Sequence, residues 1–403
     1  MFFSHTTPHI SQSITLANAQ PLKVTMGEDT QTLDEVVVTA LGIKREQKAL
    51  SYNVQQVKGD ELTTIKDANF MNALAGKVAG VNINSSSAGA GGAVRVIMRG
   101  TKSLEKDDNA LYVIDGVPMF NVTSGSADGG TMSDQPGTNS VADINPEDIE
   151  SMSILTGPSA AALYGSAAAN GVVLITTKKG EEGKPAINVR TEFGFTSPTK
   201  RPKMLDSARW AELYNEASST KYYSDETIQK YREHSDPDLY PDVDWFDALF
   251  DDMAENQRVN LSITGGGDIV KYYVSGSFYN ESSIYKNAGN IYGYDSSINY
   301  NKFNFRANID LNLTKSTVLN VNLANIYEKS FGPGFGDNDN DIWGYTFNAS
   351  PNAFPIEYSD GKLSGPSTDS GFNPWNMLVH SGYREQFWNS AQALVGVTQD
   401  IGK

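Results

Sequence analysis

The strongest constraint on the fold of this chain is a set of long segments in which apolar and polar side chains alternate. In the clearest of them, residues 302–314, Phe, Ala, Ile and Leu fall on one face, and Asn, Arg and Asp on the other. Alternation with a period of two predicts half-buried β-strands. The pattern recurs, with one less regular case at the end, in residues 187–195, 258–264, 271–279, 319–323 and 387–398. The second half of the chain is therefore predicted to form a β-sheet.

The connections between these segments alternate in length. They are long at residues 196–256, short at 265–268, long at 281–301, short at 315–316 and very long at 328–384. A soluble sandwich has no reason to keep this order, whereas a membrane barrel has tight turns at one end and large loops at the other. The order of connections therefore favours an antiparallel transmembrane β-barrel.

Residues 43–180 have a different character, with short mixed elements and many glycines. Strand-like runs at 149–155 and 172–177 flank the alanine-rich stretch 159–169. This stretch follows Gly157-Pro158, and Pro suits the first turn of a helix because its missing N–H would have no partner there. We expect a helix that packs where backbones approach closely, within an α+β domain that precedes the barrel.

The composition excludes several classes of function. The chain has 32 basic and 48 acidic residues and a net charge of −16, which argues against a nucleic-acid partner because phosphate neutralisation needs clustered Lys and Arg. There is no cysteine, so disulfides and thiolate catalysis are excluded. The four histidines lack metal-binding spacing, and the acidic run 337–341 lacks the Gly and Glu of a calcium loop. We expect no catalytic residue, no metal, no cofactor and no enzyme activity.

Neither a transmembrane helix nor a signal peptide is visible in the sequence. The apolar runs are shorter than the roughly 18 residues that a membrane helix needs. Residues 1–20 lack a basic region followed by an apolar one, which a secretory signal peptide would show.

Several long motifs, in this order, resemble those of the SusC/RagA-type TonB-dependent outer-membrane transporters, and the resemblance covers nearly all of the chain from residue 33 onward. The matching stretches are LDEVVVTALG at 33–42, LAGKVAGVNI at 74–83, VRVIMRG at 94–100, LYVIDGVP at 111–118 and DIESMSILTGPSAAALYGSAAANGVVLITTKKG at 148–180. The resemblance implies an α+β plug domain followed by an incomplete antiparallel transmembrane β-barrel, which has about 22 strands in the complete fold and about six here.

The resemblance also divides the chain into parts. Residues 1–32 are similar to the end of a carboxypeptidase-regulatory-like β domain with its linker, and residues 33–42 to a TonB box. Residues 43–182 correspond to the plug, and residues 183–403 to the N-terminal part of the barrel with its extracellular loops. The implied location is the cell outer membrane, in contact with its lipid and with the N-terminal segment in the periplasm.

The TonB box implied by the resemblance contains three consecutive valines. On the residues alone, this run is either a buried strand or an extended peptide that adds to the sheet edge of a partner through main-chain hydrogen bonds. The resemblance implies the second, with the C-terminal domain of TonB as the partner. The expected TonB-binding residues are Asp34, Glu35, Val36, Val37, Val38 and Thr39.

Two further groups of site residues are expected. Arg95 and Arg99 match plug arginines that pair with barrel carboxylates in related transporters and hold the plug, although each could also be an ordinary charge at a sheet edge. Aromatic side chains of an outer loop stack on sugar rings or peptides, or pack the loop on itself. The candidate substrate contacts are Asp115, Trp343, Tyr345, Phe347 and Trp375.

Together these features predict TonB-dependent import of a glycan or an oligopeptide across the outer membrane, with a SusD-like lipoprotein as a lid. Two alternatives remain open. One is a surface nutrient-binding receptor or sensor that does not transport, and the other is a non-functional truncated fragment.

Overall fold

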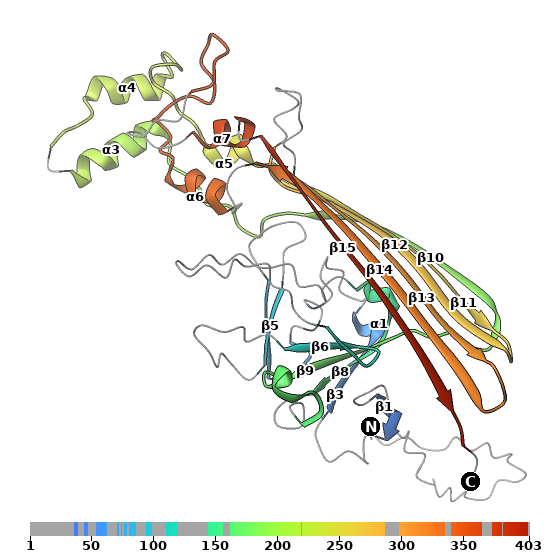
Figure 1. The fold of residues 1–403 in the computed structure, drawn as a ribbon. Helices are drawn as coiled ribbons and strands as arrows, with labels where there is room; N and C mark the ends of the chain where they lie inside the picture. The colour runs from blue at the N-terminus through green and yellow to red at the C-terminus, as the bar shows by residue number, and fades with distance from the viewer. Residues whose placement is uncertain are drawn as a thin grey trace, which may run out of the picture.

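The computed structural model of the chain contains two large β-sheets, with helices gathered at one end of the longer one (Figure 1). No helix in the described ranges is long and apolar enough to cross a membrane. The structure describes residues 36–38, 44–46, 54–62, 71, 74, 76–78, 80–85, 94–98, 110–119, 144–155, 162–218, 220–286, 298–334, 340–364, 373–380 and 382–401.

The longer sheet, which we call the wall, has six antiparallel strands in sequence order, so that each strand pairs with the next one along the chain. Five of the six alternating segments lie within one strand each, and the sixth, 302–314, runs two residues past the end of its strand; the predicted antiparallel sheet is confirmed. The strands are β10 (Gly183–Thr196), β11 (Ala254–Gly266), β12 (Val270–Ser282), β13 (Asn299–Asn312), β14 (Thr317–Pro333) and β15 (Tyr383–Gln399).

Most wall strands extend beyond the alternating segments toward the end that carries the long connections. In β14 only residues 319–323 alternate cleanly, yet the ladder with β15 continues to Pro333. From residue 324 to Pro333 both faces of β14 carry polar residues, with Asn325 and Lys329 on one face and Glu328 on the other. The hydrogen-bonded ladder therefore continues where the alternation of side chains has ended.

The outer face of the wall carries a continuous apolar band. On β13 this face runs from Phe303 to Leu311, and a row of rings, Phe278, Phe303 and Tyr327, crosses three strands with centroid separations of 4.8 and 6.2 Å. The eight residue steps from Phe303 to Leu311 span about 27 Å, or about 20 Å of membrane thickness for strands tilted by about 35–45°. The band and its aromatic edge have the dimensions of the lipid-facing surface of an outer-membrane barrel.

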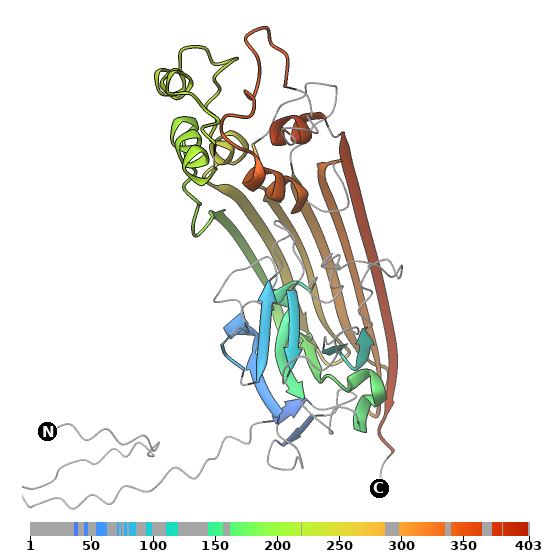
Figure 2. The same ribbon diagram turned by 90° about the vertical axis from the view of Figure 1, so that its left-hand side faces the viewer.

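The shorter sheet, which we call the inner sheet, lies on the concave side of the wall (Figure 2). Its strand order is β3-β8-β9-β6-β7, antiparallel except for the parallel pair β6 and β9. Two separate two-stranded sheets pair β1 with β2 and β4 with β5. The strands are β1 (Val36–Val38), β2 (Lys44–Glu46), β3 (Val54–Lys58), β4 (Val81–Ser85), β5 (Val94–Met98), β6 (Leu111–Ile114), β7 (Val117–Met119), β8 (Ile149–Leu155) and β9 (Val172–Thr177).

Side chains cover both faces of the inner sheet, as expected for the β-branched run of β9. Met152, Val173 and Ile175 lie in a cluster on one face, and Val172 and Leu174 lie in a second cluster on the other. Short helical elements complete this part of the chain: α1 (Gly59–Leu62) and the 3₁₀ turns η4 (Pro146–Asp148) and η5 (Gly165–Ala168).

The helix expected over residues 159–169 is shorter and less regular than predicted. Residues 162–164 are helical, and the chain then tightens into η5, where Gly165 has a φ of 69°. The rest of the stretch, residues 159–161, lies outside the described residues. A left-handed glycine cannot continue an α-helix, so this residue, which the alanine-rich composition conceals, ends the α-helical part.

Five helices lie at the long-connection end of the wall (Figure 1). α3 and α4 match the two helices that the sequence predicts in the first long connection. The helices are α3 (Ser207–Ala217), α4 (Asp225–Glu233), α5 (Trp245–Leu249), α6 (Asn340–Asn348) and α7 (Pro374–His380). α5, α6 and α7 share one apolar cluster, in which Trp245 and Leu249 are fully buried.

Gly171 gives a test of the packing within the inner sheet. Its φ is 106°, and an added Cβ would lie 2.3 Å from Sδ of Met98 and 3.3 Å from the carbonyl oxygen of Leu155. We expect Gly171→Ala to lower the local stability of β8 and β9 by about 1–3 kcal/mol, through the left-handed backbone and this overlap. Hydrogen exchange of the β8 and β9 amides measures the loss.

Gly165→Ala is the matched control, because its φ is also positive but an added Cβ meets no atom within 4 Å. Its expected cost is about 1 kcal/mol, from the backbone alone. Equal losses in the two variants would contradict the packing at Gly171.

Candidate functional site

The candidate site is the junction between the inner sheet and the polar concave face of the wall. Hydrogen bonds and ion pairs connect described residues of the inner sheet and its turns to strands β10 to β13 of the wall. The inner-sheet partners are the turn between β6 and β7, the η4 turn that leads into β8, and the end of β9.

Asp115 occupies the tight turn between β6 and β7. Ile114 pairs directly with Val117, so Asp115-Gly116 is a two-residue loop, and its φ angles of 48° and 89° are those that an Asp-Gly hairpin turn requires. The Asp115 carboxylate accepts hydrogen bonds from the Thr177 N–H (2.9 Å) and the Thr177 hydroxyl (2.6 Å). The end of β9 therefore fixes the direction in which this carboxylate points.

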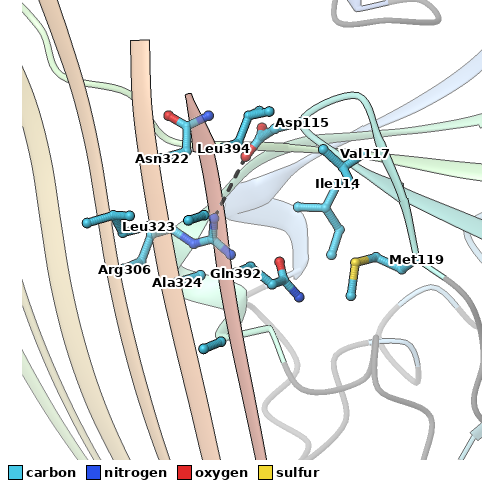
Figure 3. A pocket seen from close by; sticks show the side chains of 12 residues that line it. Ile114, Asp115, Val117, Met119, Arg306, Asn322, Leu323, Ala324, Gln392 and Leu394 are labelled. Atoms are coloured by element: carbon cyan, nitrogen blue, oxygen red, sulfur yellow. Dashed lines mark ion pairs between the residues drawn. The ribbon is translucent and has the colours of Figure 1, made fainter. Parts of the chain in front are cut away.

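Arg306 of β13 lies between two carboxylates that belong to turns of the inner sheet. Its Nη1 is 3.7 Å from Oδ2 of Asp115 (Figure 3). Its Nε is 3.6 Å from Oδ2 of Asp148. All three side chains are less than one tenth exposed. Both distances exceed that of a hydrogen bond, so the attraction is electrostatic, and it acts between side chains that are almost completely buried.

Asp148 ends the η4 turn, which Asn145 caps by accepting a hydrogen bond from the Glu147 N–H. Its carboxylate accepts a hydrogen bond from the Tyr273 hydroxyl at 2.9 Å. Complete burial raises the pKa of Asp148 above its usual value, although Arg306 and the hydroxyl donors Ser275 and Tyr273 oppose this shift. Loss of water around the charged form outweighs these favourable contacts.

Three further contacts extend the junction on either side. Asn145 donates to the side chain of Asn260 at 3.2 Å, and Glu147 pairs with Arg190 at 2.6 Å. On the other side Asn308 donates both to the Thr177 hydroxyl (2.8 Å) and to the Lys178 carbonyl (2.7 Å). The chain Asn308, Thr177, Asp115 is thus a continuous hydrogen-bonded path from the wall to the turn.

This chemistry suits a contact that holds and then releases. A buried ion pair adds little net stability, because removing the charges from water costs about as much as their attraction returns. It nevertheless fixes the orientation of the groups it joins. The junction can therefore hold the inner sheet in register with the wall and still be separated once water enters.

The expected TonB-binding residues lie partly within the described chain. Val36, Val37 and Val38 form β1, which pairs antiparallel with Lys44–Glu46. Asp34, Glu35 and Thr39 lie outside the described residues. The valines are extended, and in this two-stranded sheet one edge of β1 faces away from β2.

Of the two expected latch arginines, Arg95 lies in β5, opposite Asn84, and Arg99 falls outside the described residues. The contact that the described part of the chain does contain has the opposite arrangement of charges. Its arginine, Arg306, belongs to the wall, and its carboxylates, Asp115 and Asp148, belong to turns of the inner sheet.

The candidate substrate contacts do not form a single site. Asp115 lies at the junction, whereas the aromatic candidates belong to the loop helices at the far end of the wall (Figure 1). Trp343, Tyr345 and Phe347 lie on α6, where Phe347 is half exposed and contacts Phe246 edge to face at 5.0 Å. Trp375, on α7, packs against the apolar cluster of α5, α6 and α7.

Arg306, Asp148, Tyr273 and Asn308 were not identified from the sequence. Each has an ordinary place in its own segment, since Arg306 and Asn308 are two polar residues among several on one face of a strand. Their roles arise from the approach of segments more than a hundred residues apart. The one local signal is the Asp-Gly pair at 115–116, which predicts a hairpin turn with an outward carboxylate.

Comparison with known proteins agrees with this architecture. Residues 46–172 match the family described as TonB-dependent Receptor Plug Domain. A TonB-dependent receptor of Formosa agariphila is 31% identical over 369 residues, which cover 88% of this chain and 33% of that protein. The TonB-dependent receptor SusC of Bacteroides thetaiotaomicron is 30% identical over 297 residues, which cover 73% of this chain and 27% of that protein.

Among solved structures, the RagAB peptide importer in its open-open state matches with a TM-score of 0.64 and 22% identity, over 85% of this chain and 38% of that one. This likeness shows a shared fold. The chain spans about a third of the length of the curated relatives it matches.

The plug domain, followed by antiparallel strands with an apolar outer face, defines the class as TonB-dependent receptors, which are transport proteins of the outer membrane and not enzymes. Within this class the chain belongs to the SusC/RagA type. It contains the plug and the six strands of the wall. From here on we call the inner sheet with its turns the plug.

The raised pKa of Asp148 predicts how the junction responds to pH. The folded protein holds the proton of the Asp148 carboxyl more tightly than the unfolded chain does. Protonation of Asp148 therefore stabilises the fold at low pH, and this stabilisation is lost as pH rises from the ordinary Asp range through the raised pKa. Asp148→Asn keeps the carboxyl shape without the charge. We expect the variant to gain stability relative to the wild type as pH rises, by at most about 1.4 kcal/mol per pH unit in that window.

Thermal unfolding of the two proteins, measured in parallel from pH 4 to pH 8, gives this difference. If the variant instead becomes less stable relative to the wild type as pH rises, the attraction of Asp148 to Arg306 outweighs the effect of its burial.

Proposed function

We propose that the protein containing this chain imports a glycan or an oligopeptide across the outer membrane, driven by TonB and covered by a SusD-like lipoprotein. The observation that carries the proposal is the plug held on the polar face of a wall whose outer face is an apolar, aromatic-edged band. A plug joined to the wall by releasable polar contacts suits a pore that opens only when the plug is moved.

The domain boundaries follow from this proposal. Residues 33–42 are the TonB box, residues 43–182 the plug, and residues 183–403 the first part of the barrel. The short turns of the wall and the N-terminal segment face the periplasm, and the helices α3 to α7 face outward. The SusC-like sequence and the fold shared with a peptide importer support both the transport role and a lipoprotein lid.

The proposed link to TonB depends on the main chain of Val36–Val38. Their extended backbone and their edge turned away from β2 suit the addition of a strand from the C-terminal domain of TonB. Asp34, Glu35 and Thr39 would flank that strand. The alternative is a surface receptor that binds nutrients without transport, and it needs no such strand.

Val37→Pro tests the proposal, because proline removes a backbone N–H and disfavours a paired strand. We expect TonB-dependent uptake of the nutrient by intact cells to fall by about tenfold or more, while surface binding is unchanged. Val37→Thr, which keeps the N–H and the branched side chain, is the matched control and should transport normally. A receptor without transport would show no TonB-dependent uptake in any of the three proteins.

A further inference from the structure

A cavity of about 310 Å³ lies beside the Arg306 contact, between the β6–β7 hairpin and strands β13 to β15 (Figure 3). Its plug side carries Ile114, Val117 and Met119, and its wall side carries Asn322, Gln392 and Leu394. Asp115 and Arg306 also line it. This volume is at the lower end of the range for small-molecule sites.

The cavity lies to one side of the polar contacts between the described residues of the plug and those of the wall. The polar contacts between the described parts of the plug and the wall end on β10 to β13, whereas the cavity opens toward β14 and β15. The wall pattern itself creates the space, because the residue opposite Arg306 on β14 is the small Ala324.

Arg306 is one of the two charged side chains that line this cavity. It is 5% exposed, and its carboxylate neighbours lie at 3.6 and 3.7 Å, beyond hydrogen-bond distance. Its Nε faces Asp148, which does not line the cavity, and has no hydrogen-bond partner within the described structure. Charge alone therefore holds the guanidinium to Asp115, and a ligand in the cavity that accepts hydrogen bonds competes for its terminal N–H groups.

The charges around Arg306 decide what kind of acceptor fits. Asp115 and Asp148 bring up to two negative charges to one positive charge, with Lys178 farther away near Asp148. The site therefore has no surplus positive charge to attract a carboxylate. Its other polar groups, the amides of Asn322 and Gln392, each donate and accept.

We propose that this cavity binds one ring of a neutral saccharide, whose oxygens accept from Arg306 and whose hydroxyls donate to Asp115 and to the Asn322 amide, while Gln392 lies at the side of the ring. Vicinal hydroxyls pair well with planar groups of this kind, and Ile114, Val117, Met119 and Leu394 provide apolar surface for the C–H face of the ring. A sugar bound here competes with Asp115 and Asp148 for the guanidinium and weakens the hold of the plug. The inference rests on the proposed import function, and it favours a glycan over a peptide as cargo.

The test uses the intact receptor in outer-membrane fragments, with Gln392→Cys labelled by a small neutral maleimide. The probe is a mixture of glucose, galactose, mannose, xylose and arabinose, at tens of millimolar each. We expect the mixture to slow labelling by about tenfold, because the sugar covers the thiol. Ser390→Cys is the matched control, since this residue is on the same face of β15 but does not line the cavity, and its labelling should not change.

Three results would overturn the inference: no protection by the sugars, equal protection at both cysteines, or equal protection by the dipeptide dialanine. A second variant, Arg306→Lys in the Gln392→Cys background, keeps the charge but loses the planar donors. Protection should then disappear, while the plug keeps its resistance to added protease.

This experiment separates the inference from the function it rests on. Labelling is measured at equilibrium and does not require TonB. If Val37→Pro abolishes uptake but the sugars leave Gln392→Cys unprotected, the saccharide site is wrong and the transport function stands. If the sugars protect but uptake is independent of TonB, the site stands and the transport function fails.

Discussion

The arrangement of the plug in the wall depends on a small number of buried polar contacts around Arg306. Arg306 presents its charge to two carboxylates that reach it from separate turns of the inner sheet, one before β8 and one between β6 and β7. Each turn is fixed by its own hydrogen bonds, Asp115 by Thr177 and the η4 turn by its Asn145 cap. The wall therefore binds a surface that is already ordered, and the register between the two sheets follows.

The two faces of the wall are in contact with different media, and this difference explains its sequence. The outer face is mostly apolar along the band, because a polar group there would lie in lipid, and the Asn325 amide on this face donates a hydrogen bond to Asn389 of the next strand. The inner face is polar along β10 to β13, where it contacts described residues of the plug, and it carries smaller or apolar residues, such as Ala324 and Leu394, beside the cavity at β14 and β15. The described contacts therefore hold the plug at one side, next to a region with space for a small molecule.

The sequence predicted the wall better than it predicted the junction. Alternation is a property of a single strand, so residues 187–195 and 302–314 show it without knowledge of their neighbours. The ends of β14 could not be found in this way, because above the apolar band both faces are polar and the ladder alone continues. Residues 162–168 were expected to be α-helical, but the positive φ of Gly165 ends the helix. Arg306 and Asp148 could not be paired from the sequence, because only the folded chain brings β13 against η4.

The position of β3 at the edge of the inner sheet has a mechanical consequence. β3 follows the N-terminal residues 36–46 in the chain and pairs only with β8, whose first residue, Ile149, comes directly after Asp148. Tension applied to the N-terminal segment enters β3 at Val54, whereas Asp148 lies beyond the opposite end of the ladder, where Lys58 pairs with Ser151. The five rungs are therefore loaded together, in shear, and α1, which follows β3 and contacts η4, bears on the same turn. A pull on the N-terminal segment thus reaches the ion pair through a stiff connection, with little slack to take up first.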